Sequence, residues 1–364
     1  MTTPHFHRLT VADLRRETRD AVSIAFAVPK DLAAAYAFEP GQYLTLRATI
    51  AGEDVRRPYS ICSGSGDGEL RVAVKEVEGG LFSSYANRAI KPGDAVDVMT
   101  PMGRFTTPLD PRAARVYLGI ACGSGITPLM SHIKSVLCRE PESRFVLIYG
   151  NRSSRDIIFK DALDDLKDRH LGRLTVHHVL SREAQDVALL NGRLDAEKIA
   201  TLVRSSLPTQ EIDHALLCGP QGVIEAAQAA LARLGVPAER VHVELFTPAS
   251  PSAPFAGSRP DDAARERGAQ AAIATATVTL DGATHEFPVA AGEGIVDAGL
   301  RAGLELPFSC KGGMCCTCRA MLVSGTVKMV QNYSLEPWEM EKGFILACQS
   351  RPTSPEVKLD FDQA

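Results

Sequence analysis

The first hundred residues alternate apolar positions with polar or small ones in short runs, and Gly/Pro turns separate these runs. The clearest runs lie at 44–50, 70–74 and 95–99. Alternation with a period of two is typical of strands that bury one face. The pattern therefore predicts an antiparallel β-barrel or sandwich over residues 1–109, with the barrel preferred, interrupted by one helix at 81–90.

From about residue 114 the apolar runs become continuous, and amphipathic stretches separate them. The apolar runs lie at 116–121, 145–149, 174–180, 215–218 and 241–246. The stretches with helical spacing lie at 128–139, 159–169, 196–203 and 221–234. Strands that are apolar nearly throughout, with helices between them, indicate a parallel sheet covered on both faces. Residues 110–246 are therefore predicted to form a doubly wound α/β domain.

A change of composition separates this domain from the rest of the chain. Residues 247–274 are rich in Pro, Ala, Ser and charged side chains, which favours a flexible linker. Beyond it, apolar stretches at 275–280 and 284–288 flank Asp281-Gly282, a strong signal for a two-residue hairpin turn. We expect a third domain over residues 275–364.

Composition and charge exclude several classes of protein. The chain is 45% hydrophobic and 23% charged, which is ordinary for a folded globular protein. A net charge of -4 argues against nucleic-acid binding, and 11 acidic against 7 basic residues place the acidity in 276–364. No apolar run approaches the roughly 18 residues of a membrane span, and no basic flank precedes an apolar segment near residue 1. The expectation is a cytoplasmic protein that does not contact a membrane.

The strongest chemical signal is a group of cysteines in the third domain. Their spacing, with four and then two intervening residues and a distant fourth cysteine, is that of a plant-type [2Fe–2S] centre. Gly312 and Gly313 allow the backbone to fold around a cluster and to donate N–H groups to its sulfurs. The predicted ligands are Cys310, Cys315, Cys318 and Cys348. A structural zinc site is the alternative, although zinc sites usually combine two Cys-x2–4-Cys pairs.

On these residues, 275–362 resemble a plant-type ferredoxin fused behind a reductase. The resemblance implies a β-grasp (α+β) fold for this domain. The spacing selects Cys315 as the ligand of the Cys315-Cys316 doublet, so Cys316 is expected to be a non-ligand.

The barrel carries a matching flavin motif. Arg57-Pro-Tyr59-Ser60 resembles the R-x-Y-S motif of the ferredoxin–NADP reductase family. The resemblance implies that Arg57 neutralises a flavin phosphate, Tyr59 stacks on the isoalloxazine ring, and Ser60 hydrogen-bonds flavin N5. Gly80 and Ser83 open the predicted helix as the family's G-x-x-S phosphate motif does. The residues alone do not separate FAD from FMN, and the resemblance implies FAD.

A glycine loop follows the first strand of the α/β domain. Gly123-Ser-Gly125-Ile-Thr127-Pro128 stands between strand 116–121 and a helix, the context of a dinucleotide loop. Pro128 replaces the third glycine of the Rossmann fingerprint and suits a first helical turn. The ferredoxin–NADP reductase family uses this G-x-G-x-x-P form, so Gly123, Gly125, Thr127 and Pro128 are expected at the pyrophosphate.

The ends of the next two strands indicate which nucleotide binds. They carry Arg152 and Ser181-Arg182, whereas an NAD site is expected to have an acid at the ribose 2′-hydroxyl. Arginine suits a 2′-phosphate, so NADPH is favoured and NADH is the alternative. Surface charge is the competing explanation for both arginines.

Two further strand ends resemble the family. Cys218-Gly219-Pro220 matches its C-G-P motif, which implies that Cys218 lies beside the hydride-carrying carbon. Phe246 corresponds to an aromatic that covers the flavin in many relatives. Core packing is the alternative for Cys218 and for Phe246.

The motifs in this order resemble the reductase components of multicomponent oxygenases. The resemblance implies that NADPH gives a hydride to the flavin, which passes single electrons to the cluster. Ser60 and Cys218 are then the residues in contact with the reacting atoms. A di-iron oxygenase is the implied acceptor; another hydroxylase, an acyl-lipid desaturase or a hybrid-cluster protein are alternatives.

Overall fold

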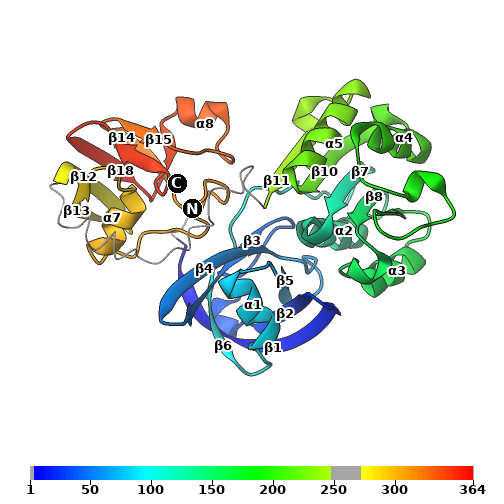
Figure 1. Cartoon of the computed structure of the whole chain (residues 1–364), viewed down its shortest axis with the longest axis horizontal. Helices are drawn as coiled ribbons and strands as arrows, with labels where there is room; N and C mark the ends of the chain where they lie inside the picture. Colours follow the sequence, from blue (N-terminus) through cyan, green and yellow to red (C-terminus); the bar gives the residue numbers. More distant parts are fainter. Residues whose placement is uncertain (1–3, 247–271, 364) are drawn as a thin grey trace. The chain divides into compact units, whose positions relative to one another are not determined.

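The computed structural model describes residues 4–246 and 272–363 (Figure 1). These residues form two compact units, one of residues 4–7, 45–58 and 272–363 and the other of residues 8–44 and 59–246. The predicted linker, 247–274, lies outside the described residues except for its last three positions. Those three belong to strand β12, so the third domain begins at Ala272.

The predicted barrel is built on a six-stranded sheet in the order β4-β3-β6-β1-β2-β5. The strands are β1 (Phe6–Thr18), β2 (Ala21–Ala27), β3 (Tyr43–Ile50), β4 (Glu53–Ser60), β5 (Leu70–Lys75) and β6 (Ala95–Met99). The predicted helix is α1 (Leu81–Arg88). Leu44 and Leu46 are fully buried, as the period-two pattern predicts, but Thr45 between them is buried too, so this part of β3 is covered on both faces.

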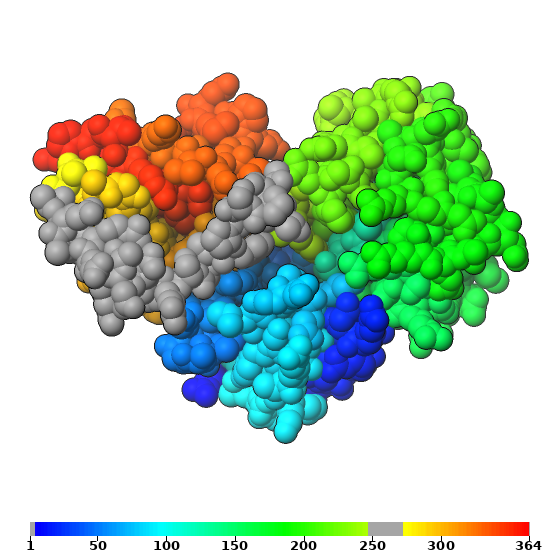
Figure 2. All heavy atoms as spheres, in the orientation of Figure 1, coloured from blue at the N-terminus to red at the C-terminus, as the bar shows by residue number. Residues whose placement is uncertain are grey.

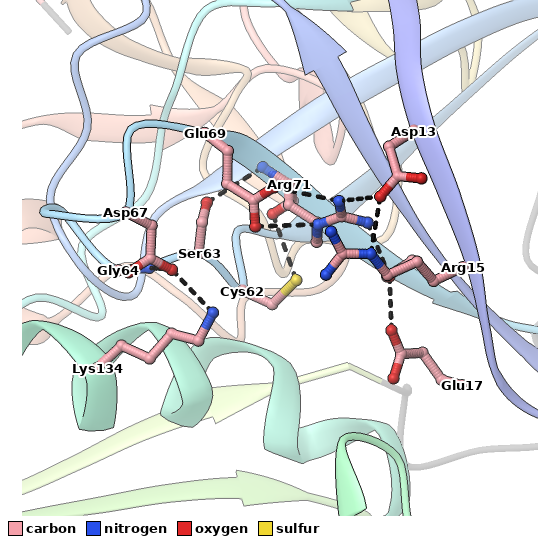
Figure 3. A network of polar contacts seen from close by, with 11 residues as sticks. Asp13, Arg15, Glu17, Cys62, Ser63, Gly64, Asp67, Glu69, Arg71 and Lys134 are labelled. Carbon is pink, nitrogen blue, oxygen red and sulfur yellow. Dashed lines mark hydrogen bonds and ion pairs between the residues drawn. The ribbon is translucent and has the colours of Figure 1, made fainter. Parts of the chain in front are cut away.

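A buried arginine organises one side of this sheet (Figure 3). Arg71 of β5 pairs with Asp13 of β1 at 2.6 Å and with Glu69 at 3.1 Å. The hydrogen bond from Arg71 lowers the pKa of Asp13. Nearby, Lys134 pairs with Asp67 at 2.8 Å. Lys134 belongs to the first helix of the α/β domain, so this ion pair links the barrel to that domain.

The α/β domain has a five-stranded parallel sheet in the order β11-β10-β7-β8-β9. Its strands are β7 (Val116–Cys122), β8 (Arg144–Asn151), β9 (Leu174–Leu180), β10 (Ile212–Gly219) and β11 (Val241–Leu245). Its helices are α2 (Ile126–Arg139), α3 (Lys160–Arg169), α4 (Ala196–Ser206) and α5 (Gln221–Arg233). The order in which strands are added to the sheet reverses between β7 and β10. An open α/β sheet forms its binding crevice at such a point.

Both faces of this sheet are covered. Helices α2 and α3 close one face and α4 and α5 close the other (Figure 1). Side chains of α4 and α5 make a continuous surface over their face (Figure 2). Along β7, Tyr117 points into one core and Leu118 into the other. A strand buried on both sides has to be apolar throughout, which explains the continuous runs in the sequence.

Two elements of this domain start two or more residues earlier than predicted. Strand β10 begins at Ile212 because the Asp213 carboxylate accepts a hydrogen bond from Val116 N at 2.9 Å, which extends the ladder through polar residues. Helix α2 begins at Ile126, directly after a 3-10 turn over Gly123–Gly125, so Pro128 lies within its first turn.

The third domain contains a five-stranded sheet in the order β13-β12-β18-β14-β16 and a small pair, β15-β17. Its strands are β12 (Ala272–Leu280), β13 (Ala283–Ala290), β14 (Arg319–Ser324), β15 (Val327–Met329), β16 (Phe344–Leu346), β17 (Ser350–Pro352) and β18 (Glu356–Asp360). Its helices are α7 (Ile295–Arg301) and α8 (Pro337–Glu341). Apolar side chains of the sheet and of α7 share one buried core.

The predicted hairpin turn of this domain is present. Asp281 and Gly282 both have positive φ, 51° and 73°, as a type I′ turn requires. The carboxylate of Asp362 accepts hydrogen bonds from both backbone amides of the turn, each at 2.8 Å. The residues that follow the last strand thus fix the turn between the domain's first two strands.

Candidate functional site

The four cysteines predicted as ligands form two pairs in the third domain. Cys310 N donates to Cys315 Sγ at 3.5 Å, and the neighbouring thiol of Cys348 raises the pKa of Cys318. Three of the four are buried and Cys315 is half-buried. A [2Fe–2S] cluster bound by four cysteines gives each iron two thiolates. The pairing therefore fits a dinuclear cluster, with one pair for each iron.

Hydrogen-bond donors surround the cysteine sulfurs. Gly312 N donates to Cys310 Sγ at 3.3 Å, and Thr317 Oγ1 donates to Cys315 Sγ at 3.2 Å. The hydrogen bond from Cys315, assisted by backbone amides of the loop, lowers the pKa of the Cys310 thiol to about 6. The same hydrogen bond raises the pKa of Cys315. Donors of this kind stabilise thiolates and the negative charge of a cluster.

The loop needs unusual backbone at three positions. Lys311, Gly313 and Cys316 have positive φ of 49°, 76° and 56°. A Cβ on Gly313 would lie 2.9 Å from the Gln331 carbonyl oxygen, so only glycine fits there. Cys316 belongs to neither pair and packs against the apolar core. This placement agrees with its exclusion from the ligand set.

The flavin motif lies at the end of β4. Ser60 is buried, and the Tyr59 ring lies 5.6 Å from the ring of Phe82 on α1. Gly80 is the N-cap of α1, and Ser83 lies in its first turn. The structure therefore brings Tyr59 close to the helix that carries the predicted phosphate-binding residues.

The polar groups of that turn already have partners. Gly80 N donates to the Val77 carbonyl at 2.9 Å, and Ser83 Oγ accepts from Val77 N at 3.1 Å. Ser83 Oγ also donates to the Gly80 carbonyl at 3.2 Å. Ser83 thus orders the turn before the helix. Amides at a helix N-terminus have no intrahelical acceptor, so those of Leu81 and Phe82 are additional candidates for binding a phosphate.

A cavity of about 720 Å³ opens at the carboxyl ends of the parallel strands. Its lining includes Gly123, Ser124, Cys122, Gly150, Asn151, Gly219, Pro220 and Phe246. Gly125 lies just below it, where a Cβ would be 2.1 Å from the Cys218 carbonyl oxygen. Thr127 Oγ1 donates to the Ser124 carbonyl at 3.0 Å and so closes the loop. The position at the switch point and the glycine loop are those of a dinucleotide site.

Cationic side chains concentrate in this cavity. Arg152 and Arg182 line it as predicted, together with Ser181. Lys75 and Arg193 line it too, although no sequence motif pointed to them. Arg193 follows Gly192 in the connection after β9, a signal that could have been noticed, whereas Lys75 comes from the barrel strand β5.

Three strand ends bring Ser60, Cys218 and Glu244 together. Ser60 Oγ lies 3.3 Å from Glu244 Oε2, and Glu244 is the register partner of Cys218 on the adjacent strand. Burial raises the pKa of Glu244 to about 8 and raises that of the Cys218 thiol well above its usual range. Glu244 was not predicted; its signal is a single acid within the apolar run of β11. Burial therefore favours the protonated carboxyl of Glu244 and the neutral thiol of Cys218.

Three family models match the chain. They are the oxidoreductase FAD-binding domain over 8–107, the oxidoreductase NAD-binding domain over 120–229 and the 2Fe-2S iron-sulfur cluster binding domain over 278–353. The chain is 46% identical to one of the subunits of 1,2-phenylacetyl-CoA epoxidase from Escherichia coli (strain K12), covering 100% of this chain and 99% of that one. The chain belongs to the family of FAD- and [2Fe–2S]-dependent oxygenase reductases.

Other relatives agree with this membership. The reductase is 38% identical to the ferredoxin reductase component of 3-ketosteroid-9-alpha-monooxygenase of Mycobacterium tuberculosis, over 99% of this chain and 97% of the relative. Its structure resembles that of phthalate dioxygenase reductase with a TM-score of 0.60 and 26% identity, covering 98% of both chains. Phthalate dioxygenase reductase is described as a modular structure for electron transfer from pyridine nucleotides to [2Fe-2S].

Membership confirms the predicted fold class and relay. The reductase passes electrons from a nicotinamide nucleotide through FAD to a [2Fe–2S] cluster. The barrel, the α/β domain and the ferredoxin-like domain provide one binding region each. In the part of the chain that the structure describes, no helix is long and apolar enough to cross a membrane.

Proposed function

We propose that this reductase takes electrons from NADPH and delivers them to the di-iron oxygenase component of a phenylacetyl-CoA epoxidase. The observation that carries this proposal is the 46% identity to a polypeptide of such an epoxidase across both full chains. The aligned region includes all three cofactor domains.

The preference for NADPH is supported by the charge of the nucleotide cavity. Lys75, Arg152, Arg182 and Arg193 line it, and among the described residues of the lining the only acid is Asp156. Arg152 and Arg182 stand just after β8 and β9, where an NAD site would need a carboxylate for the ribose hydroxyls. A 2′-phosphate there would gain charge-assisted hydrogen bonds from arginine.

The proposed catalytic residues act by contact and by protonation state. Ser60 would orient flavin N5 through its hydroxyl, and Cys218 would leave room for the nicotinamide ring at the flavin face. Glu244 keeps a proton at neutral pH and hydrogen-bonds Ser60 at 3.3 Å, so it fixes the direction of the Ser60 hydroxyl. Phe246, at the edge of the same cavity, would cover the ring until the nicotinamide displaces it.

The cysteine pairs hold the second redox group. Cys310 and Cys315 would bind one iron, and Cys318 and Cys348 the other. Bound FAD accepts two electrons and releases them singly, and the bound cluster carries one electron at a time. The donors from Gly312 and Thr317 would stabilise the more negative state of the cluster.

A second acceptor is favoured by one observation. The ferredoxin reductase component of 3-ketosteroid-9-alpha-monooxygenase is 38% identical over nearly the whole chain. The alternative is therefore electron donation to a steroid monooxygenase.

Reconstitution distinguishes the two acceptors. The purified reductase, with NADPH and O₂, is combined either with the epoxidase oxygenase component and phenylacetyl-CoA or with the steroid oxygenase component and its ketosteroid. Formation of oxygenated product is followed in both. We expect the epoxidase to form product at least about tenfold faster than the steroid oxygenase, because a cognate interface favours its own partner. Faster turnover with the steroid oxygenase would contradict the proposed acceptor.

A further inference from the structure

A buried arginine connects the flavin motif to the cluster loop. Arg56 lies on β4, immediately before Arg57 of the flavin motif, and its side chain is only 4% exposed. It belongs to the compact unit that combines residues 45–58 with residues 272–363. A charge buried to this degree requires several partners, because its desolvation is costly.

Both of its aromatic partners lie in the same unit. The Arg56 guanidinium carbon lies 4.2 Å from the centre of the Phe308 ring and 5.1 Å from that of Phe6. Phe308 is buried and stands two residues before Cys310, the first predicted cluster ligand. Cation–π contacts at such distances are strongest when they are shielded from water.

Two carboxylates complete the surroundings of Arg56. Its Nη2 lies 2.9 Å from Asp54 Oδ2 on the same strand and 3.5 Å from Glu305 Oε1. Arg47 of β3 reaches the same Glu305 oxygen at 3.0 Å. The segment that leads to Cys310 is thus held to the β3–β4 hairpin by Glu305 and Phe308 together.

Arg56 also acts on its neighbour in the sequence. Its carbonyl oxygen accepts a hydrogen bond from Arg57 Nη1 at 2.7 Å. Arg57 is the residue proposed to neutralise the flavin phosphate. The backbone and the side chain of Arg56 therefore contact the two segments that hold the two redox groups.

We propose that Arg56 is a positioning residue for electron transfer between the flavin and the cluster. In this step the reduced flavin loses one electron and the cluster gains it, with NADPH as the source of both electrons. Stacking of Arg56 on Phe308 holds the segment that leads to Cys310 against the part of β4 on which Arg57 lies, within the same compact unit. This inference rests on the electron transfer of the proposed function. It adds a residue that helps to position the redox groups for that transfer.

The test separates the two electron-transfer steps. Arg56→Ala holoenzyme is mixed anaerobically with NADPH, and the flavin and cluster absorbances are recorded separately. We expect flavin reduction at the unsubstituted rate and cluster reduction slowed by about tenfold to a hundredfold, as for a misplacement of about 1 Å. Arg56→Lys, which keeps a cation over Phe308, is expected to recover part of the rate. Arg144→Ala, which breaks the ion pair with Glu211 in the α/β domain, is the matched control and leaves both rates unchanged.

Hydrogen–deuterium exchange gives a readout that does not depend on turnover. Arg56→Ala is expected to raise exchange in peptides covering 45–58 and 304–311, whereas Arg144→Ala does not. If Arg56→Ala fails to fold, Phe308→Leu decides, since it removes the same stacking contact and predicts the same loss confined to the cluster phase.

Specific results would overturn the inference. The positioning role is rejected if Arg56→Ala reduces its cluster at the rate of the unsubstituted protein and its hydrogen–deuterium exchange is unchanged. Equal slowing of flavin reduction and cluster reduction would also reject it. If NADPH leaves the cluster of the unsubstituted protein oxidised, the relay of the proposed function itself fails, which is a distinguishable outcome.

Discussion

Single side chains at the ends of the strands have environments that change their protonation. Glu244 is the clearest case, because a carboxyl at the end of an apolar strand faces Ser60 rather than a cation. Burial raises its pKa to about 8, above the ordinary 4.5 of a glutamate. The hydrogen bond from Ser60 acts in the opposite direction and does not cancel the effect of burial.

This raised pKa predicts how stability depends on pH. Between about pH 4.5 and pH 8 the folded protein keeps a proton that the unfolded chain has released, so the parent loses stability as pH rises through this window. Glu244→Gln removes the titration. Its Tm relative to the parent should therefore rise with pH across this window, by about 2–4 °C for each kcal/mol recovered.

The matched control is Glu225→Gln, a substitution of a glutamate on α5 that hydrogen-bonds Gln221. Its Tm difference from the parent is measured over the same pH range for comparison. A Glu244→Gln difference that does not change with pH would contradict the raised pKa of Glu244.

Among the secondary-structure elements, the glycine loop between β7 and α2 is tightly constrained. A Cβ on Gly125 would lie 2.1 Å from the Cys218 carbonyl oxygen, closer than any real contact. The backbone of the loop has to touch the end of β10 for the helix N-terminus to face the cavity. A side chain here would push α2 away from β10.

Gly125→Ala is accordingly expected to damage nucleotide binding. Overpacking should cost about 1–3 kcal/mol of stability and raise the KM for NADPH by about tenfold or more. Flavin reduction at varied NADPH and thermal unfolding measure the two effects. Gly172→Ala is the control, since a Cβ there meets nothing within 4 Å. Equal behaviour of the two variants would contradict the close approach.

Elements could be predicted from the sequence where one physical signal dominates. The continuous apolar runs located all five parallel strands, and Asp281-Gly282 located its turn, because each pattern has a single low-energy solution. Residues whose place in the fold depends on tertiary contacts could not be predicted. Strand β10 extends through Asp213 because that carboxylate bonds Val116 N, a partner 97 positions away.

The same limit explains what was missed in the site. Arg152 and Arg182 could be expected from strand ends, whereas Lys75 joins them only because the barrel strand β5 and the α/β domain belong to one unit. Arg56 has no motif of its own; its role depends on Phe308, 252 positions later. Composition and periodicity contain no information about such pairs.

At the scale of the whole molecule, each compact unit combines segments that are far apart in the sequence. Residues 45–58, the greater part of the β3–β4 hairpin, belong to the unit of the ferredoxin-like domain, whereas most of the other barrel residues belong to the unit with the nucleotide cavity. One polypeptide thus takes electrons in at the crevice of the parallel sheet and releases them at the cysteine loop.

An anaerobic titration of the purified holoenzyme with NADPH, and separately with NADH, is the decisive test of this relay, with Cys348→Ser as the variant that lacks one cluster ligand. The flavin and cluster absorbances are followed individually. We expect NADPH to reduce the flavin and then the cluster at lower concentrations than NADH, and in Cys348→Ser we expect the flavin still to be reduced while the cluster signal is lost. A parent protein whose flavin is reduced while no cluster signal changes, or one that responds to NADH alone, would contradict the relay.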